Sequence, residues 1–205
     1  PVLFPDVSYS FYDVWADLFK IPYERPMLDG SFNIKPEDYT RTNGGIVFPN
    51  PNAPTGVYLE LDNVRKILDA NRDVIVIVDE AYIDFGGKSA LTLLDEYDNL
   101  LVVRTYSKSR SMAGLRIGYA IGGEELIKAL NDVKYSYNSY TMNQATIETG
   151  VAAIKDDTYF KNTVSKIIET RENAKKELKK LGFSFTDSKT NFIFATHERM
   201  PAKEI

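Results

Sequence analysis

Cysteine is absent from this sequence, and histidine occurs only once, as His197. The lack of cysteine excludes disulfide bonds, thiolate metal sites and cysteine nucleophiles. A single histidine argues against a histidine-rich metal site and against a serine–histidine–aspartate triad. No apolar run approaches the ~20 residues that a membrane-spanning helix needs. There is no basic block and the net charge is −4, which disfavours binding to nucleic acid or to an anionic membrane. A cytoplasmic location is the simplest expectation.

The composition is that of a globular protein. Apolar residues make up 43% of the 205 residues and charged residues 26%, enough for one sizeable core and the beginning of a second unit. The chain starts at Pro1 without a methionine or signal peptide, and it stops at Ile205 soon after an expected strand. We therefore expect a segment of a longer protein.

Strand-like and helix-like segments alternate along the chain. Residues 74–78 are continuously apolar and β-branched, which predicts a strand buried on both faces of a parallel sheet. The other expected strands are 45–48, 100–103, 117–121, 183–185 and 191–195, and the expected helices are 61–71, 124–131, 142–154 and 157–181. This order predicts an α/β fold with a mostly parallel sheet. We place a large domain at 1–160, and the long connecting helix with the start of a small α+β domain at 161–205.

Asp79 is the first polar residue at a predicted strand end, the edge where open α/β sheets bind their ligands. A carboxylate there needs a cation or several hydrogen-bond donors, because unpaired burial is costly. Tyr82, three residues further on, can place a phenol beside it. An isolated aspartate at a strand end is often a helix cap or part of a structural ion pair, so this position alone leaves both interpretations open.

Lys108 follows the next predicted strand. A lysine held partly out of water at such a place can act as a Schiff-base nucleophile, whereas a solvated surface lysine is the default. The surroundings favour the first interpretation. Thr105 and Ser107 supply hydroxyls, and Arg116 lies eight residues on, between two glycines. These groups are suited to binding phosphate.

A rigid turn supplies the third polar strand end. Residues 49–56 hold three prolines and a glycine, which fixes the path of the chain. A tight turn alone would explain this composition. A functional interpretation arises because this turn would bring Asn52 to the same edge of the sheet as Asp79 and Lys108. Each signal is weak by itself, but the order and spacing of all three are specific.

Taken together, these motifs resemble the fold-type I pyridoxal-phosphate (PLP) enzymes of the class I/II aminotransferase family. The sequence N-P-N-A-P-T-G at 50–56, D-E-A-Y at 79–82 and S-K with G-L-R-I-G at 107–118 carry the resemblance. It covers nearly the whole chain and implies a three-layer α/β/α large domain. Within this group, V-D-E-A-Y-I-D-F at 78–85 and Y-N at 137–138 are most similar to the histidinol-phosphate aminotransferases.

The resemblance implies the roles of three reacting groups. Lys108 carries PLP as a Schiff base and moves the substrate proton. Asp79 pairs with the pyridine nitrogen and keeps it protonated, and Tyr82 hydrogen-bonds the phenolic oxygen. These roles suit the chemistry, since PLP acts as an electron sink for a carbanion at the substrate's α-carbon.

The resemblance also implies which residues bind the cofactor without reacting. Ser107 and Arg116 hold the phosphate, with Thr105 as a further candidate, and Tyr9 stacks on the ring. The family has asparagine directly before P-T-G, where this chain has Ala53. Asn52 is the candidate to replace it.

Two further parts of such a site have no counterpart here. The family's upstream glycine-rich helix start is absent, and no downstream arginine clearly fits the substrate carboxylate. Arg171 lies in the long helix and is interpreted as a solvated charge, while Arg199 has no supporting motif. Asn191 is either a substrate-side residue or a turn residue at a strand entry. In another small departure, Ser136 stands where the family has proline.

The implied activity is amino transfer between L-histidinol phosphate (or glutamate) and a 2-oxo acid, 2-oxoglutarate or imidazole-acetol phosphate, in histidine biosynthesis. The implied partner is a second copy of the chain in a homodimer. The cofactor residues do not encode the reaction, so an aromatic aminotransferase, an amino-acid decarboxylase or a carbon–sulfur lyase stays open. A PLP-sensing regulatory domain and a cofactor-free α/β domain are the alternatives from other classes.

Overall fold

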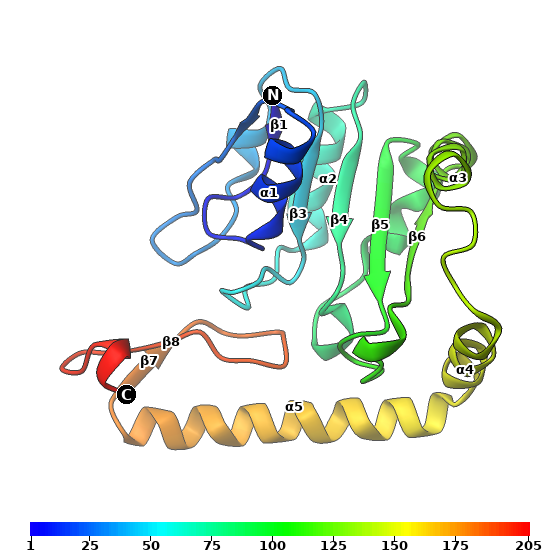
Figure 1. Cartoon of the computed structure of the whole chain (residues 1–205). Coiled ribbons are helices and arrows are strands. Elements are labelled where there is room, and N and C mark those ends of the chain that lie inside the picture. The colour runs from blue at the N-terminus through cyan, green and yellow to red at the C-terminus, as the bar shows by residue number, and fades with distance from the viewer.

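A computed structural model describes residues 1–205 and contains a six-stranded sheet with helices on both faces (Figure 1). Five neighbouring strands run parallel, in the order β2 (Tyr23–Glu24), β1 (Val2–Leu3), β3 (Ile46–Pro49), β4 (Val76–Asp79) and β5 (Leu100–Thr105). The sixth strand, β6 (Gly118–Gly122), pairs antiparallel with β5. The expectation of a mostly parallel sheet is confirmed.

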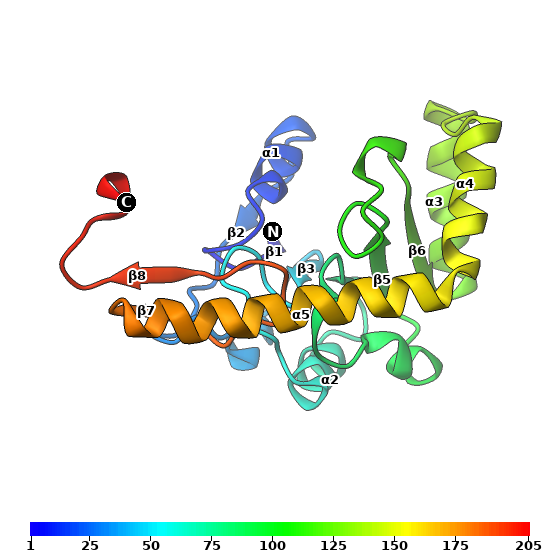
Figure 2. The same cartoon turned by 90° about the horizontal axis from the view of Figure 1, so that it is seen from below.

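Helices form the two outer layers. Figure 2 shows α1 (Phe11–Leu18), α3 (Glu124–Tyr137) and α4 (Gln144–Lys155) on one side of the sheet and α2 (Leu61–Ala70) on the other. Short 3-10 helices lie at Pro36–Tyr39, Ile83–Phe85, Ala90–Glu96, Ala113–Leu115 and Ala202–Glu204. The chain therefore has the expected three-layer α/β/α architecture.

The long helix α5 (Asp157–Lys180) crosses beneath the carboxyl ends of the parallel strands (Figure 1). It leads to a separate antiparallel pair, β7 (Phe183–Phe185) and β8 (Ala195–His197). No helix of the structure is both long and apolar enough to span a bilayer.

The main core lies between α2 and the sheet. Val64, Ile67 and Leu68 share one face of α2 because they are spaced three and four residues apart, and all three are fully buried. They pack with Val76, Val78 and further apolar residues of β3, β4 and β5 in a single cluster. Burial of this face of α2 fixes the helix on the sheet.

Two expectations about the strands need correction, and two strands were not expected. The strand expected at 191–195 begins only at Ala195, because residues 188–192 form a turn in which Ser188 and Thr190 bond to the carbonyl of Phe192. The strand expected at 74–78 begins only at Val76, and it is not fully buried on both faces, since Val76 and Val78 are fully buried but Ile77 is half-buried. Strands β1 and β2 were not predicted, because each has only two residues and is too short for a hydrophobic alternation to be recognised.

The turn at 188–192 is fastened to the rigid loop after β3. The amide of Lys189 donates to the carbonyl of Gly56 at 2.8 Å, and the hydroxyl of Thr186 donates to the carbonyl of Thr55. Gly56 has φ +73°, and a Cβ placed on it would lie 2.6 Å from Oγ of Ser188. Only glycine fits there without strain.

We therefore expect Gly56→Ala to destabilise the complete protein by at least about 1–2 kcal/mol, the cost of a left-handed alanine, with the clash at Ser188 added. Urea unfolding monitored by circular dichroism measures this difference. Gly30→Ala is the matched control, because nothing lies within 4 Å of its added Cβ. Equal stability of the two variants would contradict the packing argument.

Candidate functional site

The carboxyl ends of β3, β4 and β5 bring the three predicted motifs together. Pro49 pairs with Asp79 and Asp79 pairs with Val103 in the sheet, so the three strands end side by side. The loops that follow carry Asn52, Tyr82 and Lys108. The structure thus places the polar residues at the edge where α/β proteins bind ligands.

Asp79, the last residue of β4, is a partly buried acid with two hydrogen-bond donors. Its Oδ1 accepts a hydrogen bond from the amide of Ala81, and its Oδ2 accepts one from the hydroxyl of Tyr12, both at 3.0 Å. Burial raises the pKa of the Asp79 carboxyl, while the two hydrogen bonds and the charge of Lys108 act in the opposite direction. The arrangement suits a carboxylate that faces a cationic ligand atom.

Tyr12 is a site residue that sequence reasoning missed. It lies on α1, 67 positions from Asp79, and its ring is buried. Burial and the neighbouring carboxylate raise the pKa of Tyr12 well above its usual value, so the phenol remains a donor. The only sequence signal is its place in the aromatic run Tyr9-Ser10-Phe11-Tyr12 at the start of α1.

Lys108 lies near Tyr82 and Asp79. Its Nζ is 5.2 Å from the centre of the Tyr82 ring, and its charge lowers the pKa of Asp79. The preceding hydroxyls bond to each other, since Oγ1 of Thr105 donates to Oγ of Ser107 at 3.0 Å. The amide of Ser107 also donates to Oγ1 of Thr105, which fixes the start of the lysine loop.

A cavity of about 350 Å³ opens at this edge. It is lined by seven residues, Ser8, Tyr9, Ser10, Ala53, Pro54, Tyr82 and Phe192. Tyr9, at the mouth, meets Tyr12 edge-on, with 5.6 Å between ring centres. Phe192 meets Tyr82 edge-on at 5.1 Å. The turn after α5 therefore supplies one wall, and Phe192 is a further lining residue without a motif to mark it.

Asn52 does not present a free amide to this cavity. Its Nδ2 donates to the carbonyl of Val7 and to the hydroxyl of Thr55, and its Oδ1 accepts from Ser8. The side chain is buried. Ala53 lines the cavity instead and has no polar group. Asn52 thus anchors the loop in this structure, and a ligand contact would have to replace one of these bonds.

Arg116 stands apart from the other residues. It is exposed, its backbone is left-handed with φ 55°, and its Nη1 donates to the carbonyl of Ala113 at 3.1 Å. No hydrogen bond joins it to Ser107 or Thr105. Its guanidinium is therefore open to bind an anion.

The expectation that Arg171 is a solvated charge is wrong. Its side chain is only 6% exposed, and Nη1 donates to the carbonyls of Phe85 at 3.0 Å and Thr190 at 2.7 Å. Because Phe85 follows β4 and Thr190 precedes Phe192, this arginine ties α5 to both sides of the site. The exposed Asn191 lines a separate cavity of about 420 Å³ against α5.

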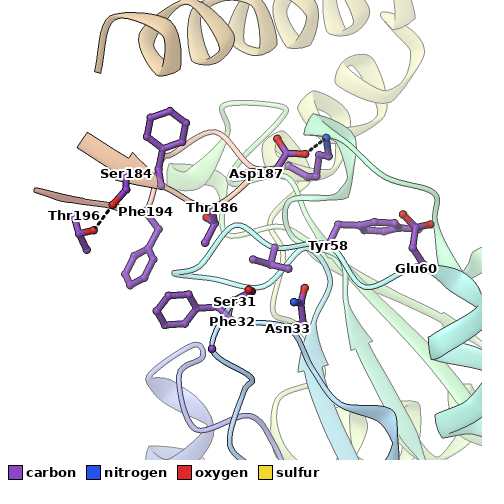
Figure 3. Close-up of a pocket in the computed structure, with 14 residues that line it drawn as sticks. Ser31, Phe32, Asn33, Tyr58, Glu60, Ser184, Thr186, Asp187, Phe194 and Thr196 are labelled. Atoms are coloured by element: carbon purple, nitrogen blue, oxygen red, sulfur yellow. Dashed lines mark hydrogen bonds and ion pairs between the residues drawn. The ribbon is translucent and has the colours of Figure 1, made fainter. Parts of the chain in front are cut away.

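Another cavity, of about 530 Å³, lies between residues 30–33 and the β7–β8 pair (Figure 3). Two pairs of its lining side chains bond to each other. Asp187 bonds to Lys189 at 2.9 Å, and Ser184 bonds to Thr196 at 2.8 Å, the pairs joined by dashed lines in Figure 3. None of the predicted site residues lines this cavity.

The fold and the site together define an α/β protein with a lysine, a carboxylate and a phenol at the carboxyl edge of its sheet. The chain belongs to the aminotransferase class I and II family, whose model matches residues 1–204. It is 53% identical over 201 residues to a histidinol-phosphate aminotransferase of Lactococcus lactis subsp. cremoris, covering 98% of this chain and 56% of that protein. The chain thus spans a little over half the length of the curated relatives it matches.

Solved structures share the fold. Histidinol-phosphate aminotransferase from Clostridium acetobutylicum superposes with a TM-score of 0.92 at 24% identity, over 99% of this chain and 63% of that one. The enzyme from Sinorhizobium meliloti, solved in complex with pyridoxal-5'-phosphate, gives 0.88 at 22% identity, over 97% and 55%. At these identities the likeness establishes the architecture.

The bond from Tyr12 to Asp79 yields a prediction. We expect Tyr12→Phe to raise the pKa of the Asp79 carboxyl further, because a hydrogen bond that lowers it is lost. Carboxyl-carbon NMR of aspartate-labelled protein measures this as a titration midpoint at higher pH than in the wild type. Tyr140→Phe, at an exposed tyrosine, is the control. An unchanged midpoint in Tyr12→Phe would show that the bond does not hold in solution.

Proposed function

We propose that the complete protein is a PLP-dependent aminotransferase that acts on histidinol phosphate. The amino group passes between L-histidinol phosphate and 2-oxoglutarate, with imidazole-acetol phosphate and glutamate as the other pair. The observation that carries the proposal is the gathering of Lys108, Asp79 and Tyr82 at one sheet edge. The choice of substrate is supported by the names of the curated relatives, which are 50–53% identical to this chain.

The residues present fit the cofactor. PLP has a cationic ring nitrogen, an aldehyde, a phenolic oxygen and a phosphate, and it needs a complementary group for each. Asp79 offers a bonded carboxylate, Lys108 an amine and Tyr82 a phenol, next to a cavity of about 350 Å³. Arg116 offers a guanidinium with open donors. When bound, PLP supplies an electron sink for the substrate's α-carbon.

The work of the chain's own residues then follows from their chemistry. Nζ of Lys108 would hold the cofactor covalently and, once free, would take the substrate's α-proton and return it to another carbon. Asp79 keeps its partner nitrogen protonated through an ion pair in a partly desolvated place. Tyr12 orients that carboxylate, and Tyr82 would donate a hydrogen bond to the cofactor's phenolic oxygen.

Binding without reaction falls to the neighbouring loops. Arg116, Ser107 and Thr105 provide a guanidinium and two hydroxyls for the phosphate. Tyr9, at the mouth of the cavity, provides an aromatic face for the ring. Asn52 contributes by holding the loop that carries Ala53.

We also propose that residues 1–160 form the large domain and residues 161–205 the connecting helix with the start of a small domain. The course of α5 supports this division, because it joins the three-layer unit to the separate β7–β8 pair. The cavity draws lining residues from both parts, with Phe192 from the second. The cytoplasmic location stays a prediction.

We expect the complete protein, incubated with PLP and reduced with borohydride, to carry a pyridoxyl group on Lys108. Peptide mass spectrometry locates the modified residue. Lys108→Ala should carry none and should lose turnover with histidinol phosphate and 2-oxoglutarate, because it lacks the amine that carries the proton. An adduct on another lysine, or normal transamination by Lys108→Ala, would overturn the proposal.

A homodimer is a further part of the proposal. It is supported by the apolar face of α1, where Phe11, Val14, Trp15 and Leu18 are exposed beside the mouth of the cavity. We expect sedimentation of the complete protein loaded with PLP to give twice the mass of one chain. A monomer at micromolar concentration would contradict this part and leave the cofactor assignment intact.

A further inference from the structure

The D-E-A-Y-I-D segment, residues 79–84, carries two charged side chains besides Asp79, those of Glu80 and Asp84. Glu80 follows Asp79 directly, yet its side chain is completely buried in the protein. Oε2 accepts hydrogen bonds from Nε of Arg104 at 3.0 Å, from Nη2 at 2.8 Å and from the hydroxyl of Ser89 at 2.7 Å. Oε1 accepts from the amide of Ala90 at 2.6 Å. Both oxygens of this buried carboxylate therefore have hydrogen-bond partners.

Arg104 connects this buried carboxylate to the lysine loop. It lies on β5, four residues before Lys108, and its side chain is mostly buried. Beyond Glu80, its Nη1 lies 3.9 Å from Oδ1 of Asp84. The guanidinium of Arg104 therefore lies between the carboxylates of Glu80 and Asp84. Its hydrogen bonds to Glu80 fix its orientation.

Asp84 in turn holds the residue after Lys108. The hydroxyl of Ser109 donates to Oδ2 of Asp84 at 2.5 Å, and Ser109 is only 3% exposed. Two backbone bonds also hold this loop, from the amide of Ser111 to the carbonyl of Lys108 and from the amide of Met112 to the carbonyl of Tyr106, both at 3.0 Å. Further along, Nη1 of Arg110 donates to the carbonyl of Ala153 at 2.6 Å. The Ser109–Asp84 bond is the side-chain contact made by the residue directly after the lysine.

We propose that Asp84 is a positioning residue for Lys108, acting through Ser109 and itself oriented by Arg104. The inference rests on the proposed function, because it concerns the placement of the amine that takes up PLP. In that step Nζ of Lys108 adds to the aldehyde carbon and water leaves. The rate depends on the geometry of approach, and a misplacement of ~1 Å can cost about 100-fold.

A purely structural role for this pair makes a different prediction. It would lower stability and leave the speed of the step at Lys108 unchanged. A positioning role slows that step even where the protein is folded and saturated with PLP. The two roles are therefore separated by a rate measured at saturating PLP, with thermal unfolding followed in parallel.

The experiment uses the complete protein after removal of PLP. PLP is added back at saturating concentration, samples are reduced with borohydride at successive times, and the Lys108 peptide is quantified by mass spectrometry. Borohydride delivers hydride to the carbon joined to Nζ, which makes each bond permanent. The variants are Ser109→Ala, Asp84→Ala, their combination, and Asp84→Asn, which keeps an acceptor for the Ser109 hydroxyl.

We expect Ser109→Ala and Asp84→Ala each to slow the labelling of Lys108 by about 10-fold to 100-fold. The double variant should be no slower than the slower single variant, because both remove the same bond. Asp84→Asn should label close to the wild-type rate. Asp38→Ala is the matched control. Like Asp84, Asp38 lies in a 3-10 helix and next to a basic side chain, that of Lys35 at 2.7 Å.

Wild-type labelling rates in Ser109→Ala and Asp84→Ala would overturn the inference. So would a double variant whose slowing equals the product of the two single effects. Should Asp84→Ala fail to fold, a wild-type rate in Ser109→Ala overturns it alone. An absence of any Lys108 adduct in the wild type is a different result, because it rejects the proposed function itself.

Discussion

The in-register parallel pairing of β3, β4 and β5 is the constraint on which the rest of the site depends. Because Pro49, Asp79 and Val103 are neighbours in the sheet, the three loops that follow must leave from one edge. The amide of Asn50 donates to the carbonyl of Asp79, and the amide of Glu80 donates to the carbonyl of Val103, both at 2.8 Å. These ladder bonds continue the pairing past the last apolar residues and into the functional loops.

The side chains of residues 79–84 divide into two groups with different contacts. Asp79 and Tyr82 are neighbours of Lys108, whereas Glu80 and Asp84 bond to Arg104 and Ser109. Burial raises the pKa of the Glu80 carboxyl, and its bonds to Ser89, Ala90 and Arg104 oppose that rise. Breaking a buried ion pair of this kind costs about 3–5 kcal/mol, because the remaining charge is left without a partner. The scaffold and the site are thus built from one short segment of sequence.

The second part of the chain reaches the site through a few specific contacts. Gly56 allows the turn at 188–192 to approach the loop after β3, and Arg171 bonds to carbonyls on both sides of the junction. These contacts bring Phe192 against Tyr82. Because the Arg171 guanidinium donates to backbone carbonyls, it holds the path of the main chain at this junction.

The sequence by itself determined the α/β class, the mostly parallel sheet, the family and the set of residues at the strand ends. Those features depend on local periodicity and on ordered motifs, which a linear sequence contains. Only the tertiary structure decided that Tyr12 bonds to Asp79, that the amide of Asn52 donates to the carbonyl of Val7, and that Arg171 is buried. Each of these depends on partners from 19 to 86 residues away in the chain. Such contacts follow from packing in three dimensions, and no pattern along the sequence records them.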